Sequence, residues 1–182
     1  MKKAYIIHGW GAHPEDNWFF WLKGELEEQG FQVKVPNMPS TDFPLQKQWL
    51  EHMKEIIGPD NQTYLIGHSL GVIAILKYLE SINTKIKAAI LVAGFSESVG
   101  IREIESFTEE PLNYKRVKSN CEEFVVIHSD NDPLVPLEKA KILEKEFNAK
   151  LIIMNGAEHI DAPYGEFKLP TALEEILRIA NN

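Results

Sequence analysis

The sequence predicts an α/β protein in which a six-stranded, mainly parallel sheet carries helices on both faces. Three observations lead to this fold class. Short apolar runs recur along the chain, segments of helical period separate them, and prolines and glycines stand near the expected helix ends. Such alternation favours right-handed crossovers, so ligands are expected beyond the carboxyl ends of the strands.

Six segments are expected to form strands. Five are continuous apolar runs, the pattern of strands buried on both faces. The sixth, at 32–35, alternates polar and apolar residues, as an edge strand or a strand with one wetter side does. The five apolar runs cover 4–7, 63–66, 88–92, 124–127 and 151–154.

Apolar residues at helical spacing predict five helices that pack on the sheet. Pro44, Pro136 and Pro170 stand where three of them should begin, and Gly30 follows the first as a stop. Only the polar stretch 95–121 departs from the alternation of strands and helices, and it is expected to form a short helix and a loop over the site. The stripes are Trp18, Trp21, Leu22 and Leu26; Trp49, Met53, Ile56 and Ile57; Ile73, Leu76 and Leu79; Ala140, Leu143 and Phe147; and Leu173, Ile176, Leu177 and Ala180.

The composition limits the classes of function. With 182 residues, of which 44% are hydrophobic, the chain fits one domain spanning 1–182. A net charge of −8 with scattered basic residues argues against nucleic-acid and membrane partners. Cys121 is the only cysteine. The four apolar residues after Lys3 are too few for a secretory signal, and no apolar stretch is long enough to span a membrane. We therefore expect a cytoplasmic protein.

The segment Gly67-His68-Ser69-Leu70-Gly71 has the Gly-x-Ser-x-Gly pattern of a nucleophile elbow. It follows an apolar run and opens the apolar helix expected at 72–79, which is the context that the motif requires. Small residues at Gly67 and Gly71 permit a tight, strained turn that lifts the Ser69 hydroxyl toward solvent. The plain alternative is a glycine-rich turn with a capping serine.

A serine hydroxyl needs a base to take its proton, and histidine is the usual one. His159 follows the last expected strand and precedes the last helix, so it should lie at the same sheet edge as Ser69. A histidine in a loop can also be a simple surface residue, but this position favours the catalytic role. The other five are His68 in the elbow, His52 within a helix, His128 at a strand end, and His8 and His13 in an earlier loop.

The base needs a carboxylate that fixes its tautomer and stabilises its cation. Asp130 and Asp132 both follow the fifth expected strand. We favour Asp132, because the adjoining Pro-Leu-Val-Pro at 133–136 is stiff enough to hold the carboxylate, whereas Asp130 suits the turn. A metal loop is the rival interpretation, but the downstream ligands of a calcium site are missing, so no metal is predicted.

Acyl transfer also needs two donors for an oxyanion hole. The amide of Leu70 is one candidate, and the amide of Trp10, in the glycine-flanked loop 8–11 after the first strand, is the other. The alternative for this loop is a plain glycine turn. Trp18 and Trp21 share a helical face and are expected in the core rather than around substrate.

With these residues placed, the chain resembles the α/β-hydrolase superfamily, and more closely the small YdeN-like serine hydrolases related to the human retinoblastoma-binding hydrolase. The resemblance implies a minimal fold with strand order 2-1-3-4-5-6, little or no cap, and a Ser69-His159-Asp132 triad. The supporting segments are His8-Gly9-Trp10, Asn17-Trp18, Trp21-Leu22, Asn37-Met38-Pro39, Gly67-His68-Ser69-Leu70-Gly71, Phe107-Thr108 with Pro111, and Lys118-Ser119-Asn120-Cys121.

One departure from the human relative concerns its partner. The relative's Leu-x-Cys-x-Glu tract would fall at 57–61, which lacks the cysteine and the glutamate, and the other possible tract, at 119–123, has Ser119 in place of leucine. A retinoblastoma-type partner is therefore not expected.

The sequence thus predicts hydrolysis of small esters or activated amides through an acyl-enzyme, without a cofactor. Little sequence remains for a cap, so we expect a shallow pocket that favours short acyl groups or small amino-acid esters. Thioester and peptide hydrolysis use the same machinery and stay open. A binding protein that keeps the fold without the chemistry is the alternative class.

Overall fold

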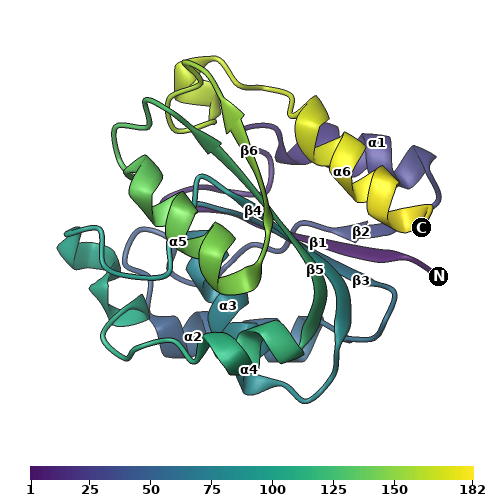
Figure 1. Ribbon diagram of the computed structural model, residues 1–182, viewed down its shortest axis with the longest axis horizontal. Helices are drawn as coiled ribbons and strands as arrows, with labels where there is room; N and C mark the ends of the chain where they lie inside the picture. The colour runs from purple at the N-terminus through teal and green to yellow at the C-terminus, as the bar shows by residue number, and fades with distance from the viewer.

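The computed structural model describes residues 1–182 and contains one six-stranded sheet in the order β2-β1-β3-β4-β5-β6 (Figure 1). Every neighbouring pair of strands is parallel. The predicted fold class and strand order are therefore confirmed. The strands are β1 (Lys3–Ile7), β2 (Gln32–Lys34), β3 (Thr63–His68), β4 (Ile86–Val92), β5 (Cys121–Ser129) and β6 (Lys150–Met154).

Burial along the strands follows their position in the sheet. All residues of β3 are buried because it lies between β1 and β4 and under helices on both faces. At one edge, β2 buries only Val33 of its three residues, which agrees with its alternating pattern. The expectation that 151–154 is buried on both faces was wrong, because β6 is the other edge and Ile153 is 43% exposed.

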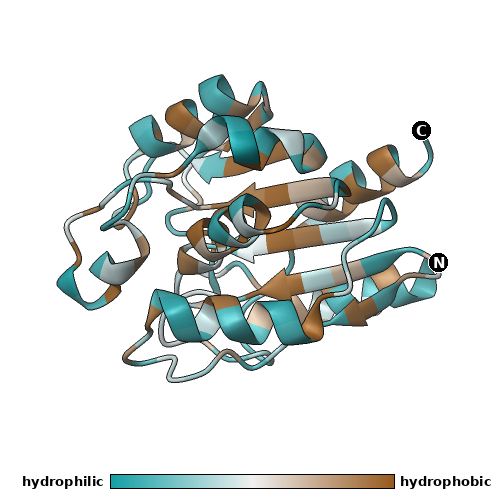
Figure 2. Cartoon of the chain, turned by 90° about the horizontal axis from the view of Figure 1, so that it is seen from below, coloured by the Kyte–Doolittle hydropathy of each residue, from teal (hydrophilic) through white to brown (hydrophobic).

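The helices form two layers. One face of the sheet carries α1 (Phe19–Glu28) and α6 (Pro170–Ala180), which contact each other although they lie at opposite ends of the chain (Figure 1). The other face carries α2 (Gln46–Ile56), α3 (Leu70–Ser81), α4 (Tyr114–Ser119) and α5 (Leu137–Phe147). Figure 2 shows that the strands between these layers are largely apolar and that the visible arrowheads point away from the two termini.

Proline and glycine mark the helix ends much as expected. Pro170 is the first residue of α6, Pro136 immediately precedes α5, and Pro44 lies two residues before α2. After α1, Gly30 turns the chain with φ at 80°. No helix has the length and apolar character needed to cross a membrane.

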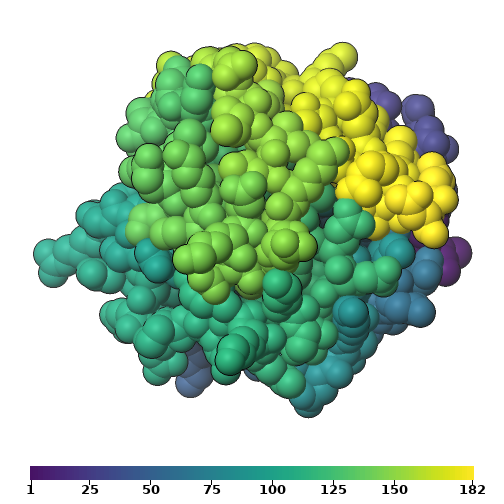
Figure 3. Space-filling model, viewed as in Figure 1, coloured from purple at the N-terminus to yellow at the C-terminus, as the bar shows by residue number.

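The stretch 95–121 contains the 3₁₀ helix η1 (Arg102–Phe107) and α4. In the space-filling view the teal atoms of the region near residue 100 project from one side of the molecule (Figure 3). A second 3₁₀ turn, η2 (Ala162–Tyr164), follows β6. Both 3₁₀ helices follow strands, at the edge where the sequence predicts the site.

Candidate active site

Ser69 occupies a strained turn between β3 and α3. Its φ of 53° and ψ of −117° lie in a region that residues with a Cβ rarely adopt. The Ser69 amide donates to the carbonyl of Val92 on β4 at 2.9 Å. A Cβ on Gly71 would lie 2.1 Å from the backbone oxygen of Ile7, so only glycine lets α3 begin this close to β1. The packing of β1, β3 and α3 therefore maintains the strain.

The loop after β1 lies directly beside this turn. A Cβ on Gly9 would stand 3.2 Å from the Ser69 Cβ. The Trp10 amide donates to no protein group, while the Trp10 indole nitrogen donates to the carbonyl of Asp42 at 3.0 Å. Leu70 is the first residue of α3, where an amide has no acceptor within its own helix. Both predicted oxyanion donors are thus free N–H groups on segments that adjoin Ser69.

A cavity of about 150 Å³ opens at this edge of the sheet. Ser69 and His159 both line it, and most of the other lining side chains are apolar. The expected loop over the site contributes part of the wall. The lining residues are Gly9, Trp10, His68, Ser69, Phe95, Val99, Ile101, Ile104, Leu134, Val135, His159 and Asp161.

His159 is hydrogen-bonded to the carboxylate of Asp132. Its Nδ1 lies 2.8 Å from Oδ2 and 3.0 Å from Oδ1 of the carboxylate. Oδ1 also accepts from the amides of Leu134 and Val135, each at 2.9 Å, and the Asp132 side chain is fully buried. The carboxylate fixes Nδ1 as the donor and leaves Nε2 of His159 without its proton.

Burial alone would raise the pKa of Asp132. The hydrogen bond and positive charge of His159, together with the Val135 and Leu134 amides, outweigh burial and hold the pKa below its usual value. Asp132 therefore stays ionised at neutral pH and can stabilise a protonated His159.

Three consecutive side chains at the end of β5 hold the loop that carries His159. Each accepts a hydrogen bond from one of three consecutive amides that precede the histidine. The bonds run from Gly156 to Asp130 (2.8 Å), from Ala157 to Ser129 (3.0 Å) and from Glu158 to Asn131 (3.0 Å). Glu158 and Ile160, on either side of His159, have φ values of 50° and 53°. These bonds hold the loop in a backbone conformation that residues with a Cβ rarely adopt.

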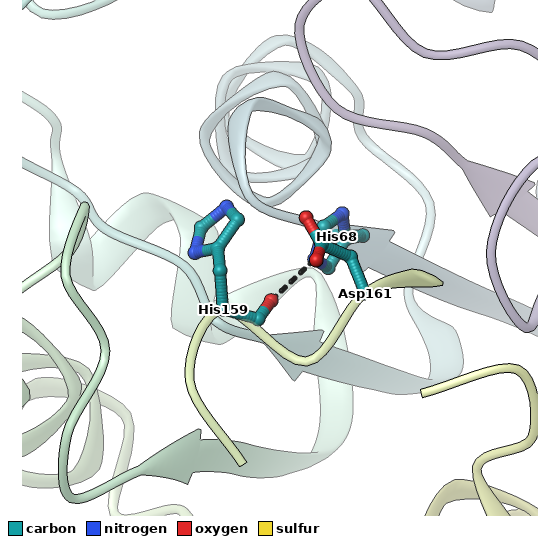
Figure 4. Close-up of side chains that lie close together, drawn as sticks. All are labelled: His68, His159 and Asp161. Carbon is teal, nitrogen blue, oxygen red and sulfur yellow. Dashed lines mark hydrogen bonds between the residues drawn. The ribbon is translucent and has the colours of Figure 1, made fainter. Parts of the chain in front are cut away.

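Two further side chains hold the carbonyl groups of this loop. Nε2 of His68 donates to the His159 carbonyl at 2.9 Å, the contact drawn as a dashed line in Figure 4. The indole nitrogen of Trp18 donates to the Ile160 carbonyl at 2.9 Å. Trp18 is fully buried, as expected of a core residue, but its indole also binds the loop that carries His159.

His68 is held in its neutral form. Burial, followed by the charge of His159, lowers the pKa of His68 to about 3. Because Nε2 donates, Nδ1 carries no proton, and it is buried without a partner. His68 thus supports the loop and adds no charge to the cavity.

The remaining histidines do not line the cavity, although Nε2 of His128 lies 3.8 Å from Oδ2 of Asp132. His52 falls within α2 and His128 within β5, and Nε2 of His128 contacts the Val135 carbonyl at 2.9 Å. His8 is buried after β1, where its Nε2 accepts from the Met38 amide at 3.1 Å. None of these three lines the cavity.

Asp161 is a site residue that the sequence reasoning missed. It lines the cavity two residues after His159, and its Oδ1 is buried without a hydrogen-bond partner. Burial raises the pKa of Asp161, while the nearby His159 charge opposes the shift. The only signal in the sequence is an acidic residue in the histidine loop, which is common in solvated loops.

His68, His159 and Asp161 are the one group of potential metal ligands, with donor atoms within 4.8 Å of one another (Figure 4). Asp132 occupies Nδ1 of His159, so a metal here would take Nε2, the nitrogen that a base needs. His68 uses Nε2 for the His159 carbonyl, so only its buried Nδ1 would remain as a ligand. The donor set therefore suits proton transfer better than a resident metal.

The fold and the geometry of this edge define the class of protein: an α/β hydrolase. The model of the family described as "Serine hydrolase" matches residues 4–177. The chain belongs to this serine hydrolase family.

Two relatives share nearly the full length of the chain. YdeN of Bacillus subtilis (strain 168), named as a hydrolase, is 32% identical over 173 residues, covering 93% of this chain and 91% of YdeN. Serine hydrolase RBBP9 of Rattus norvegicus is 26% identical over 185 residues, covering 99% and 94%.

Solved structures show the same architecture. The crystal structure of the B. subtilis ydeN product superposes with a TM-score of 0.97 at 30% identity and covers 100% of both chains. Est1E from Butyrivibrio proteoclasticus has a TM-score of 0.76 at 18% identity, covering 100% of this chain and 89% of its own, which shows the shared fold alone.

Proposed function

We propose that this chain hydrolyses small esters or activated amides, with Ser69 as nucleophile, His159 as general base and acid, and Asp132 as the carboxylate that orients the base. The observation that carries the proposal is the 2.8 Å bond between Asp132 and His159, in a loop that shares a cavity with the strained Ser69. A histidine oriented by a carboxylate, in the same cavity as a strained serine, supports nucleophilic catalysis by serine.

The proposed reaction has two halves. Nε2 of His159 removes the Ser69 proton as Oγ forms a bond to the substrate carbonyl carbon, and His159 then gives that proton to the leaving alcohol or amine. The acyl group remains on Ser69. A water molecule, deprotonated by the same nitrogen, attacks the acyl carbon; the carboxylic acid leaves and Ser69 recovers its proton.

The amides of Leu70 and Trp10 would stabilise the negative oxygen that forms in each half. Leu70 starts α3, so the partial positive charge of the helix N-terminus adds to its donor. The Trp10 amide has no partner in the protein and is free to donate to a substrate. Removal of one such donor typically costs about 100- to 1,000-fold in kcat.

The cavity favours a short acyl group. Its volume of about 150 Å³ is comparable with cavities that hold a benzene-sized molecule of about six heavy atoms. The walls from Phe95, Val99 and Ile104 are apolar. Long acyl chains would extend into solvent.

The test is labelling by a fluorophosphonate together with turnover of short-chain activated esters. Ser69→Ala should abolish both, because the hydroxyl is the proposed bond-forming atom. Ser81→Ala is the matched control: Ser81 is an exposed serine at the far end of the same helix, and its hydroxyl donates to the Tyr78 carbonyl at 2.8 Å. It should behave as the wild type.

Absence of labelling in folded wild-type protein would contradict the proposal and favour a binding role for the fold. Labelling that persists in Ser69→Ala would assign the nucleophile elsewhere. Comparison of matched esters, thioesters and anilides would then define the bond that is cleaved.

A further inference from the structure

His128 is a fully buried histidine of β5 that lies beside the proposed catalytic carboxylate. Its Nε2 is 2.9 Å from the carbonyl oxygen of Val135 and 3.8 Å from Oδ2 of Asp132. A carbonyl oxygen only accepts, so Nε2 must carry the ring proton and donate to Val135. The proposed chemistry gives this histidine no role, because the base that Asp132 binds is His159.

The bond from His128 closes the turn that carries Asp132. Both backbone groups of Val135 are engaged: its amide donates to Oδ1 of Asp132 at 2.9 Å, and its carbonyl accepts from His128. Val135 is only 1% exposed, which leaves little access for water to replace that donor. The segment 133–136 is therefore restricted by its two prolines and is also bound to β5 by a side chain.

An apolar side chain in place of His128 would avoid the burial of polar atoms. Nδ1 of His128 is buried without a hydrogen-bond partner, which destabilises a fold. Burial lowers the pKa of His128, so the ring is neutral at neutral pH and adds no charge beside Asp132. The one feature that leucine would not supply is the Nε2–H group. Oδ2 of Asp132 otherwise accepts only from Nδ1 of His159, so this second N–H dipole lies close to an oxygen with room for it.

We infer that His128 is a positioning residue for the proposed reaction: its Nε2–H group holds the turn at 132–135 so that the carboxylate of Asp132 stays directed at His159. The inference rests on the proposed hydrolase function and adds a residue to its machinery. His128 does not line the cavity, so it acts through Asp132 and not on the substrate. Orientation of the base by its carboxylate is what serine catalysis depends on, and a small displacement of either group is costly.

The experiment compares His128→Leu with Asn120→Leu, a matched control. Asn120 precedes β5 at the sheet edge remote from Ser69, and its buried amide donates to the carbonyls of Leu79 and Ile82, each at 2.9 Å. Each variant removes a buried donor from backbone carbonyls and should lower the melting temperature by roughly 3–10 °C. Only His128→Leu should also lower kcat for a short-chain activated ester, by about 10- to 100-fold. The kcat of Asn120→Leu should stay within about threefold of wild type.

His128→Gln tests whether the N–H group is the responsible feature. Glutamine can place an N–H group near the position of Nε2, so this variant should recover most of the kcat that His128→Leu loses. Equal kcat in folded His128→Leu and Asn120→Leu would show that His128 only stabilises the fold and would overturn the inference. Hydrolysis that depends on Ser69 would still support the proposed function in that case.

Two NMR measurements need no turnover. In the wild type, the ring-nitrogen chemical shifts of His128 should place its proton on Nε2, and a proton on Nδ1 would overturn the inference even if no variant folded. The downfield resonance of the Nδ1 proton that His159 donates to Asp132 should shift or broaden in His128→Leu and stay unchanged in Asn120→Leu. An unchanged resonance in folded His128→Leu would overturn the inference. A wild type that hydrolyses no ester would contradict the proposed function alone, because an altered resonance would still support the placement of Asp132 by His128.

Discussion

Replacing Asp132 by asparagine tests the proposed catalytic geometry with almost no change in shape. Oδ1 accepts from the amides of Leu134 and Val135, at 2.9 Å each, so the oxygen of an asparagine must stay there. The NH₂ group of the asparagine then takes the place of Oδ2, which in the wild type lies 2.8 Å from Nδ1 of His159. Nδ1–H would then keep only the 3.0 Å contact with Oδ1, which already accepts from two amides, and would face the NH₂ donor unless the proton of His159 moves to Nε2.

That tautomer cannot accept a proton from Ser69. We therefore expect kcat to fall by about 1,000- to 10,000-fold, because the base is held in the wrong tautomer. The variant should remain folded, because both backbone amides keep their acceptor and no cavity is created. We expect the free energy of unfolding to fall by about 1–3 kcal/mol, the contribution of one hydrogen bond to a charged group.

The assay is ester turnover with thermal unfolding measured on the same preparation. Asp130→Asn is the matched control. In the wild type the Gly156 amide donates to Oδ1 of Asp130 at 2.8 Å, and the side-chain oxygen of an asparagine can still accept that bond. The kcat of Asp130→Asn should fall by less than about tenfold, as expected for a residue that acts only on the loop. Equal losses in the two variants, or a folded Asp132→Asn protein within tenfold of wild type, would refute the assignment of Asp132.

Three other predictions concern the framework around the site. Gly71→Ala would place a Cβ 2.1 Å from the carbonyl oxygen of Ile7 on a central strand. We expect fluorophosphonate labelling, measured on gels, to be lost and the melting temperature, measured by circular dichroism, to fall by roughly 3–10 °C. Trp18→Phe keeps an aromatic ring in the core but leaves the Ile160 carbonyl without its donor, which should cost about 1–3 kcal/mol in denaturant unfolding and lower kcat. The lowered pKa of Asp132 means that its ionisation stabilises the fold above the unfolded carboxyl pKa near 4, and this stabilisation is lost as the pH falls through the lower folded pKa. The difference in melting temperature between wild type and Asp132→Asn should therefore narrow as the pH falls from about 5 through the lowered folded pKa of Asp132; a constant difference would contradict this.

The features that could be predicted from the sequence depend on local pattern or chain order. Ser69 is recognisable because strand, glycine-flanked serine and helix are contiguous, and parallel topology then brings the loops after β5 and β6 to the same edge. Asp132 could be preferred to Asp130 because of its proline-rich neighbours. The structure gives both residues a place, since Asp130 binds the Gly156 amide and Asp132 binds His159.

The features that the sequence did not indicate depend on contacts between distant segments. Trp18 lies 142 residues from Ile160, and its apolar spacing predicts burial but not the partner of its indole nitrogen. Asp161 looks like any acidic loop residue until the walls of the cavity are known. The burial of β6 was overestimated because an apolar run does not show which strand ends the sheet.

Backbone strain in this protein coincides with the proposed reacting groups. Ser69 has a positive φ, and so do Glu158 and Ile160 on either side of His159. Each such residue costs about 1–3 kcal/mol, and the surrounding packing and side-chain hydrogen bonds offset that cost. At Ser69 the offset comes from close packing against β1, whereas at His159 it comes from polar side chains at the end of β5 and in the elbow. His68 belongs to both systems, because it precedes Ser69 in the turn and donates to the His159 carbonyl. A change in the turn should therefore reach the histidine loop through this hydrogen bond, which connects the turn of the proposed nucleophile to the loop of the proposed base.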